Sequence, residues 1–337
     1  MAATLHDVAR VAGVSIKTVS NVIHNYPHIR ANTKQRVLDA IAEVGYRPNL
    51  AARGLRLGRT GVISLVIPDL RNAYFSELAE AVMRAAAAHD LSVLIEQSGG
   101  SRESEIAALK GPRTEFVDGI LFSVLELGEE DAPLLADVRV PMVLLGERIF
   151  NGPTDHVTMR NTEGTRAATE HLIEVGCTRI IALGSHPDEE VGSAALRTLG
   201  YRQALEAAGL PFRDELVRPV GTWHRFDGAE AMREVLASGI EFDGIVGFND
   251  SLALGAMRVL SERGIRMPED VAVVGFDDID ETRYSLPTLT TIAPGRDEIA
   301  KRAVEMLVER MDNRDAPPEP RELLTEFTLV RRESTAR

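Results

Sequence analysis

Apolar residues follow a helical spacing through the first 45 residues of the chain. Val8 and Ala12 share one face of a first segment, which ends at Gly13. A second segment after Ser15 and a third over residues 32–44 have the same spacing. Two short helices joined by a turn with glycine are typical of a helix-turn-helix, whose second helix enters the major groove of DNA.

From residue 60 onward, short apolar runs alternate with helical stretches. Runs rich in valine and isoleucine, separated by helical segments, predict parallel sheets with crossover helices. Roughly 280 residues are too many for one compact sheet, so we expect an α/β domain of two lobes. The runs are GVISLVIPD (61–69), LSVLIEQSG (91–99), DGILFSV (118–124), VPMVLLGE (140–147), RIIALGS (179–185), LVRPVG (216–221), FDGIVGFND (242–250) and VAVVGFDD (271–278).

The charge of the chain is divided unevenly between its two parts. The 337 residues carry a net charge of −13, yet the first 59 hold nine basic and three acidic residues, a net charge of +6. The remaining residues therefore carry −19. A basic segment on an acidic body is expected when one end of the chain meets a polyanion such as DNA.

Composition and motifs exclude several classes of protein. The single cysteine, Cys177, rules out an intrachain disulfide and favours the cytoplasm, and no apolar run is long enough to cross a membrane. We find neither a GxSxG elbow nor a GxxxxGK[ST] phosphate loop. The polar segment GSHPDEE (184–190) is interpreted as a solvated loop. We therefore expect no enzyme activity, no metal site and no cofactor.

Polar side chains follow the predicted strands of the body. Ligands of open parallel sheets bind beyond the carboxyl ends of the strands, so these side chains should converge on one cleft. Carboxylate, amide and guanidinium groups suit sugar hydroxyls, which both donate and accept hydrogen bonds. Trp223, the only tryptophan, offers an apolar wall for a sugar ring. The polar residues are Asp69, Asn72, Ser98, Glu147, Arg148, Asn249, Asp250, Asp277 and Asp278.

Motifs along the whole chain resemble the LacI/GalR family of bacterial transcriptional repressors. The segments LHDVARVAGVSIKTVSNVI and TKQRVLDAIAEVGYRPNLAARGL resemble its DNA-binding headpiece. The body carries NxxF (72–75), RxxGY (197–201), FND (248–250), GFDD (275–278), LTTI (289–292) and RRES (331–334). The family's effector domain has a periplasmic-binding-protein-like fold.

The resemblance implies a division of the chain into three parts. Residues 1–48 form a three-helix headpiece, 49–58 a hinge helix or linker, and 59–337 an effector-binding and dimerisation domain. One lobe takes about residues 60–161 and 293–322, and the other takes about residues 162–291 and 323–337. The strands that cross between the lobes are expected near 160–163, 291–294 and 322–327.

The resemblance also implies which residues contact DNA. Ile16 and Lys17 form the groove-facing pair of the recognition helix, which begins at Ser15, and Asn21 lies one turn later. Lysine donates to guanine and asparagine pairs with adenine, whereas isoleucine packs on a thymine methyl group. Most relatives have arginine in place of Asn21. Further DNA contacts are expected from Thr4, His6, Thr18, Ser20 and Asn25, and in the hinge from Leu55 and Arg56.

For the effector site, the resemblance implies three polar anchors and an aromatic wall. Arg197, Asn249 and Asp277 are the anchors, and Trp223 with Tyr74 or Phe75 forms the wall. Asp69, Asn72, Ser98 and Arg148 complete the predicted effector-binding set.

The expected function is that of a cytoplasmic homodimer that represses carbohydrate-utilisation genes. Double-stranded operator DNA is the expected partner, and a small molecule of the sugar type, bound between the lobes, releases it. A corepressor-activated regulator that senses a purine is the alternative. A cytoplasmic sugar-binding protein and a sugar-modifying enzyme are alternatives of other classes, but the basic headpiece disfavours both.

The hinge gives the first testable prediction. Leu55 is expected to wedge into the central step of the minor groove, where an apolar side chain unstacks the bases. The Leu55→Ala variant should therefore lose operator affinity in a gel-shift titration while it still binds effector. Wild-type operator affinity in this variant would refute the wedge role.

Overall fold

The computed structural model describes residues 3–23, 26–46 and 59–337. Two compact units divide the chain, Met1–Thr60 and Gly61–Arg337. Within the described ranges, no helix combines the length and the apolar character that a membrane span requires.

The first unit is a three-helix headpiece, as predicted, made of α1 (Leu5–Ala12), α2 (Ile16–Ile23) and α3 (Ala31–Val44). Thr4 caps α1 through a reciprocal pair of bonds with Asp7, whose backbone N–H donates to the Thr4 hydroxyl at 3.4 Å. Gly13 ends α1 with a φ of 62°, a left-handed conformation that glycine adopts without a Cβ clash.

Side chains from all three helices close the headpiece core. Val8, Val19 and Val37 come from α1, α2 and α3 in turn, and each is 0% exposed. The Arg36 guanidinium of α3 donates to the backbone carbonyl of Ala12, one of the carbonyls that a helix leaves open at its end. The third helix thus fixes the turn between α1 and α2, which sets the angle between these two helices.

The second unit contains two six-stranded sheets within the described residues, one in each lobe. The first sheet has the order β11-β5-β4-β3-β1-β2, and its paired strands are parallel. Its strands are β1 (Val62–Ile67), β2 (Ser92–Gln97), β3 (Gly119–Val124), β4 (Met142–Gly146), β5 (Asp155–Met159) and β11 (Glu322–Thr325). The helices of this lobe are α5 (Ala73–Ala87), α6 (Arg102–Lys110), α7 (Ala132–Ala136) and α12 (Arg296–Asp312).

The second sheet has the order β12-β10-β9-β8-β6-β7, and β12 alone among its described strands is antiparallel to its neighbour. Its strands are β6 (Ile180–Ser185), β7 (Val217–Pro219), β8 (Gly244–Gly247), β9 (Ala272–Phe276), β10 (Thr290–Ala293) and β12 (Thr328–Val330). The helices are α8 (Asn161–Glu174), α9 (Ser193–Ala207), α10 (Arg225–Ser238) and α11 (Asp250–Glu262).

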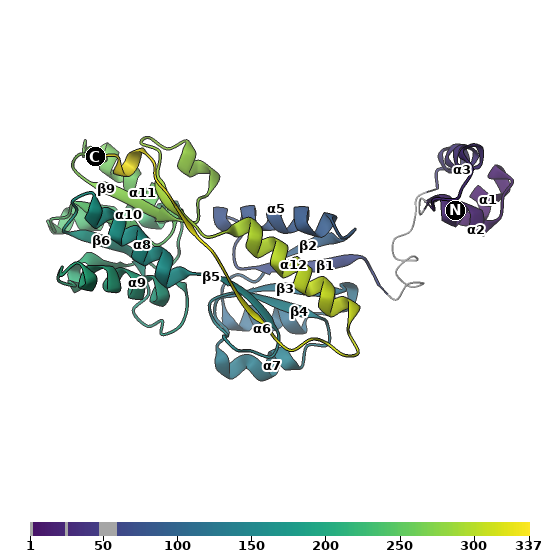
Figure 1. Ribbon diagram of the computed structural model, residues 1–337, viewed down its shortest axis with the longest axis horizontal. Helices are drawn as coiled ribbons and strands as arrows, with labels where there is room; N and C mark the ends of the chain where they lie inside the picture. Colours follow the sequence, from purple (N-terminus) through teal and green to yellow (C-terminus); the bar gives the residue numbers. More distant parts are fainter. Residues whose placement is uncertain (1–2, 24–25, 47–58) are drawn as a thin grey trace. The chain divides into compact units, whose positions relative to one another are not determined.

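Helices cover both faces of each sheet, which explains why inner strands such as β3, β6 and β9 are apolar without alternation. In β1, Leu65 and Ile67 belong to the core that contains α5 and α12. Val66, between them, belongs to the core that contains α6 and α7 (Figure 1). The two-lobed α/β fold predicted from the sequence is confirmed.

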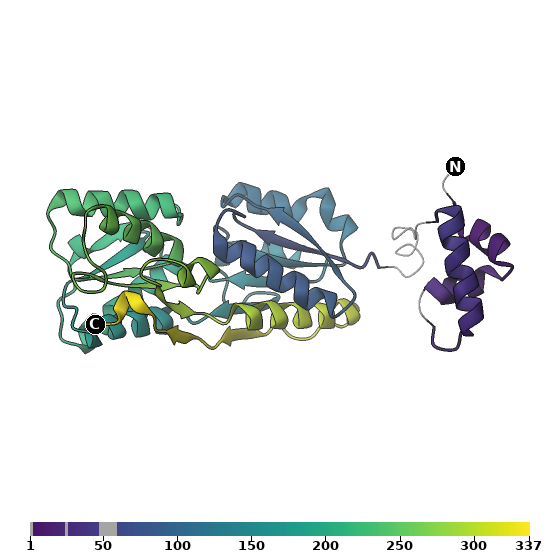
Figure 2. The same ribbon diagram turned by 90° about the horizontal axis from the view of Figure 1, so that it is seen from above.

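The chain passes between the lobes at three places in the described residues, between β5 and α8, between β10 and α12, and between β11 and β12. Figure 1 shows the last passage as the yellow segment that runs from one lobe into the other, and Figure 2 shows it from above. The lobe boundaries expected near 161, 293 and 322 lie within three residues of those in the structure. Asn161 begins α8 and Ala293 ends β10, both in the second lobe, and residues 323–325 pair with β5 in the first sheet before the chain crosses.

Glycines allow helices of the second lobe to pack closely. A Cβ added at Gly255 of α11 would lie 2.1 Å from the carbonyl oxygen of Arg225 in α10. A Cβ at Gly228 of α10 would lie 2.3 Å from the carbonyl oxygen of Leu252 in α11. Because both obstacles are backbone atoms, neither can move aside as a flexible side chain would. This contact fixes α10 and α11, whose N-terminal ends border the cavity described below.

We therefore predict that Gly255→Ala destabilises the second lobe. Alanine gains about 1 kcal/mol of helix propensity over glycine, but overpacking a close contact costs about 1–3 kcal/mol, so the free energy of unfolding should fall. Ser261→Ala, at an exposed position of the same helix, is the matched control and should change stability by less than about 0.5 kcal/mol. Urea unfolding measures both, and an unchanged or raised midpoint for Gly255→Ala would contradict the close packing.

Candidate functional site

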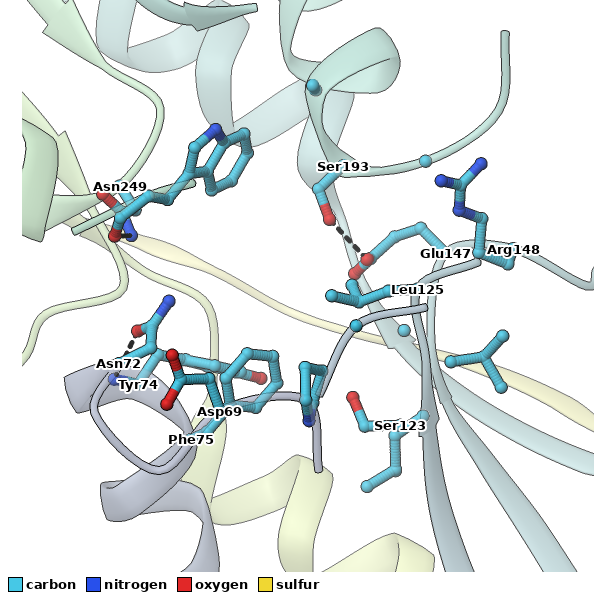
Figure 3. Close-up of a pocket in the computed structure, with 18 of the residues that line it drawn as sticks. Asp69, Asn72, Tyr74, Phe75, Ser123, Leu125, Glu147, Arg148, Ser193 and Asn249 are labelled. Carbon is cyan, nitrogen blue, oxygen red and sulfur yellow. Dashed lines mark hydrogen bonds between the residues drawn. The ribbon is translucent and has the colours of Figure 1, made fainter. Parts of the chain in front are cut away.

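A cavity of about 330 Å³ lies between the two lobes, where the carboxyl ends of their strands meet (Figure 3). Nine of the ten predicted effector-binding residues line it, and Ser98 is the exception. From the first lobe these are Asp69, Asn72, Tyr74, Phe75 and Arg148, and from the second lobe Arg197, Trp223, Asn249 and Asp277.

The Arg197 guanidinium lies at the floor of the cavity and is 3% exposed. Its Nε donates to the side-chain oxygen of Asn161 at 2.7 Å, and its Nη1 donates to the carbonyl of Phe248. The guanidinium carbon lies 3.8 Å from the centre of the Phe276 ring and 5.2 Å from that of Trp223. Burial lowers the pKa of Arg197, so these acceptors and rings are needed to hold its charge.

Asp277 faces Arg197 across 3.8 Å and is 5% exposed. Burial raises the pKa of Asp277 to about 7, against the lowering effect of the Arg197 and Arg296 guanidinium groups. Its backbone has a φ of 115°, which is rare for a residue with a side chain. The backbone N–H of Asp277 is tied to the carbonyl of Ile292 at 2.8 Å. The carboxyl group is thus held at the cavity floor, ready to exchange a proton near neutral pH.

Trp223 and Asn249 form one wall together. The indole N–H of Trp223 donates to the carbonyl of Gly184 at 3.1 Å, which fixes the plane of the ring. The amide nitrogen of Asn249 donates to the carbonyl of Trp223 at 3.0 Å. The amide oxygen of Asn249 caps α11 by accepting from the backbone N–H of Leu252 at 2.8 Å.

The opposite wall comes from the N-terminus of α5. Asn72 caps this helix by accepting from the backbone N–H of Tyr74 at 3.1 Å. The rings of Tyr74 and Phe75 meet edge to face with their centres 5.3 Å apart. Burial raises the pKa of Tyr74, so its hydroxyl stays protonated and can donate a hydrogen bond.

A buried carboxylate positions the loop that follows β3. Glu105 of α6 is 0% exposed and accepts from the backbone N–H groups of Leu125, Glu126 and Leu127 at 2.8–3.2 Å. Leu125 and Glu126 line the cavity. Burial raises the pKa of Glu105, while the three backbone donors favour its charged form. Sequence reasoning missed this support because α6 itself does not reach the cavity.

Polar pairs join the two lobes around the cavity. Each pair has one partner from the loops after β1 or β4 and the other from the second lobe. The pairs are Asp69 with His224 at 3.1 Å, Glu147 with Ser193 at 2.6 Å, and Arg148 with Glu189 at 3.8 Å. Figure 3 shows Ser193 pointing at Glu147, with Arg148 at the opposite end of the view from Asn249.

The segment interpreted as a solvated loop belongs in part to the site. His186 and Glu189 line the cavity and bond to each other at 2.8 Å. Glu189 also accepts from the backbone N–H of Ala194 at 3.0 Å, at the start of α9. The prediction failed because the pairing of Glu189 with Arg148 links segments 41 residues apart. The signal available in the sequence was the position of a carboxylate, Glu189, four residues before the start of α9.

Three strand-end residues lie away from the cavity. The Ser98 hydroxyl points back to the carbonyl of Ile67, and the two glycines after Ser98 line the cavity instead. Asp250 is 0% exposed and accepts from the hydroxyl of Thr291 at 2.6 Å. Asp278 pairs with Arg332 at 2.6 Å. The side chain of Ser98 serves the packing of the first lobe, and those of Asp250 and Asp278 serve the packing of the second, although all three residues follow strands.

The headpiece displays its predicted DNA-contacting residues along α2 and at the start of α1. Lys17 and Asn21 are one turn apart on the surface opposite the buried Val19 and Val22. Ile16 and Ser20, also one turn apart, flank this surface, and Ile16 packs partly against the headpiece core. Ser15 caps this helix by accepting from the backbone N–H of Thr18 at 3.1 Å. His6 is exposed, and the Thr4 hydroxyl is engaged in the cap of α1. Asn25, Leu55 and Arg56 lie outside the described residues.

Two family models match the chain. Residues 4–49 match "Bacterial regulatory proteins, lacI family", and residues 169–335 match "Periplasmic binding protein-like domain". The first match covers the headpiece, and the second covers most of the second lobe.

Curated relatives align along nearly the whole chain. The HTH-type transcriptional regulator RegA of Clostridium saccharobutylicum is 32% identical over 335 residues, which is 99% of this chain and 100% of that protein. The HTH-type transcriptional repressor PurR of Vibrio atlanticus is 32% identical over 314 residues, which is 93% of each chain.

Solved structures share the fold. A LacI-family protein from Sanguibacter keddieii is 52% identical with a TM-score of 0.77, over 83% of this chain and 100% of that one. The regulator CelR in complex with cellobiose is 31% identical with a TM-score of 0.72, over 98% and 99%. The lac repressor dimer bound to operator and the anti-inducer ONPF is 29% identical with a TM-score of 0.81, over 99% of each chain.

A helix-turn-helix unit joined to a two-lobed domain with a cavity between the lobes defines a DNA-binding transcriptional regulator, not an enzyme. The chain belongs to the LacI family of bacterial regulators. The resemblance noted in the sequence is thereby confirmed.

The raised pKa of Asp277 predicts how stability depends on pH. The folded state keeps this proton up to about pH 7, whereas an unfolded aspartic acid releases it near its ordinary value of 3.8. Between these values the unfolded state binds fewer protons, so this group makes the free energy of unfolding fall as pH rises. Asp277→Asn, which cannot ionise, should therefore gain stability relative to the wild type as pH rises from 4 to 8.

Urea unfolding at several pH values measures this difference. Asp69→Asn is the control of opposite sign, because hydrogen bonds from Arg71 lower the pKa of Asp69. The wild-type Asp69 stabilises the fold above the unfolded pKa, so its variant should lose stability relative to the wild type as pH rises. A stability gain of Asp277→Asn that does not grow with pH would contradict the burial argument.

Proposed function

We propose that this protein is a cytoplasmic repressor that binds operator DNA as a homodimer and releases it when a small sugar occupies the cavity between the lobes. The observation that carries this proposal is the composition of the cavity, where an indole wall stands beside convergent amide, carboxyl and guanidinium groups from both lobes. The alternative is a regulator that a corepressor such as a purine activates, as the similarity to PurR suggests.

The headpiece supplies the chemistry for operator binding. We assign base contacts to Ile16, Lys17 and Asn21 of α2, of which Lys17 is exposed and the other two are half-buried. Ser15, Thr18, Ser20, Thr4 and His6 surround this surface, and we assign them to phosphate contacts. Leu55 and Arg56 of the proposed hinge complete the set in the minor groove. The basic charge of the first 59 residues supports binding to a polyanion.

The cavity fits a sugar ring. The Trp223 indole can cover the apolar face of a pyranose, and Phe75 stands on the other lobe. Arg197, Asn249 and Asp277 present donors and acceptors at the floor, where ring hydroxyls would meet them. The likeness to a regulator solved with cellobiose supports the same ligand class.

Coupling between cavity and operator follows from the pairs that join the lobes. A ligand that inserts between Asp69 and His224, or beside Glu147 and Ser193, favours one relative orientation of the lobes over another. The ligand shifts the equilibrium by its difference in affinity for the two orientations. Both lobes contribute to the proposed dimer interface, so the change reaches the paired headpieces.

The proposal predicts reciprocal losses in two variants. A thermal-shift screen of sugars and nucleobases identifies the effector, and a gel shift then measures operator release. Arg197→Lys removes the guanidinium fork from the cavity, so operator binding should persist while the effector no longer releases DNA. Lys17→Ala should lose operator affinity by about 1–3 kcal/mol, the value of a base contact, and retain the thermal shift with effector.

Either variant can overturn the proposal. If Arg197→Lys responds to the effector as the wild type does, the cavity is not the effector site. If Lys17→Ala binds the operator as the wild type does, α2 is not the recognition helix. Operator binding that strengthens with the effector would favour the corepressor alternative.

A further inference from the structure

The cavity between the lobes continues into an outer chamber. Its lining comes from Glu126 and Arg148 of the first lobe and from residues 185–189 and 219–221 of the second. Glu126, Arg148, His186, Glu189 and Gly221 line both spaces. The chamber therefore adjoins the cavity along a shared border, and a ligand can extend from one into the other.

The two ends of the cavity differ in accessibility. Asn249, Arg197 and Asp277 close the floor, and each is at most 5% exposed. At the other end Arg148 is half-buried and Glu126 is exposed. The whole cavity, about 330 Å³, is near the lower limit of roughly 300–1,000 Å³ for ligand sites. A ligand longer than one ring must therefore leave through the end where the outer chamber begins.

The outer chamber offers the groups that a second sugar ring needs. Glu126 and Glu189 present carboxylate acceptors, and Arg148 presents a guanidinium donor group. Pro187 and Pro219 add apolar surface beside them. This mixture of polar groups and apolar surface matches the hydroxyl groups and the apolar ring face of a pyranose.

Charge in the cavity disfavours an anionic ligand. Three arginines in its lining each face a carboxyl group. The charges of Arg71 and Arg148 are matched. That of Arg197 is matched in part, because burial raises the pKa of Asp277 to about 7. The pairs are Arg71 with Asp69 at 2.8 Å, Arg148 with Glu189 at 3.8 Å, and Arg197 with Asp277 at 3.8 Å.

Glu147 adds further negative potential. It is 5% exposed, and the hydroxyls of Ser193 and Thr158 donate to it at 2.6 and 3.4 Å. Glu126 is a fifth acidic residue of the lining. A phosphate group would meet these carboxylates in a low-dielectric site, whereas uncharged hydroxyls can donate to them.

We propose that the site selects an uncharged saccharide of at least two rings, with one ring in the cavity and the next in the outer chamber. This inference rests on the proposed function, because it specifies the effector of the same site. It excludes phosphorylated sugars and single-ring sugars as the preferred ligands.

A titration of the full-length protein with matched saccharides tests the proposal. The probes are glucose and galactose, their 6-phosphates, and the disaccharides cellobiose, maltose, lactose and melibiose, measured by isothermal titration calorimetry. At least one disaccharide should bind about ten-fold more tightly than its constituent monosaccharides. The 6-phosphates should bind no better than the unmodified monosaccharides.

Gly221→Leu tests the outer chamber directly. A Cβ at this position meets no heavy atom within 4 Å, so the larger side chain has room to project without distorting the backbone. Because Gly221 borders both spaces, the comparison is between ligands: the variant should lower the affinity for the preferred disaccharide about ten-fold more than the affinity for its monosaccharide. Operator binding of the ligand-free variant confirms that it folds.

Each contrary result identifies what fails. A monosaccharide that binds as tightly as its disaccharides, or a disaccharide affinity that Gly221→Leu leaves unchanged, overturns the two-ring assignment while the sugar-responsive repressor stands. Tighter binding of a 6-phosphate overturns the charge assignment. If no saccharide binds and hypoxanthine or guanine does, both this inference and the sugar effector fail. If the wild-type protein does not bind operator DNA, the proposed function itself is overturned.

Discussion

The burial of one guanidinium group constrains the whole ligand cavity. A charged side chain that is 3% exposed is stable only if acceptors and aromatic faces surround it. Arg197 meets this requirement by drawing together Asn161 at a lobe crossing, the Phe248 carbonyl after β8, and Asp277 after β9. The same contacts place the Trp223 ring beside the cavity floor. The floor of the cavity is thus a consequence of how the second lobe satisfies this charge.

The division of the chain into two units separates recognition of DNA from recognition of ligand. The headpiece needs a small core and one displayed helix surface, and its basic charge supplies affinity for phosphates. The acidic body supplies a cavity whose walls come from separate lobes. Because pairs such as Glu147 with Ser193 join the lobes, a ligand placed between them alters the balance of lobe orientations. In the proposed mechanism, ligand binding alone regulates the protein, and no covalent reaction is required.

Much of the fold and site could be predicted because both depend on local rules. Buried parallel strands have continuous apolar runs, and their carboxyl ends lie at one edge of the sheet. For this reason Asn249 and Asp277 were correctly predicted to line the cavity. The same rule failed for Ser98, because strand position does not fix the direction of a short side chain. It also missed Glu189, whose role depends on Arg148 from the other lobe. Contacts between distant segments leave no periodic pattern in a sequence.

The central claim is that the cavity and the operator-binding surface are thermodynamically coupled. The direct test is reciprocity, measured as the operator Kd with and without saturating effector and the effector Kd with and without operator. Coupling requires the two ratios to be equal, and factors of roughly 5–150 are typical. We expect equal ratios in this range, with each ligand weakening the other. An operator Kd that is identical with the cavity filled and empty would contradict the account.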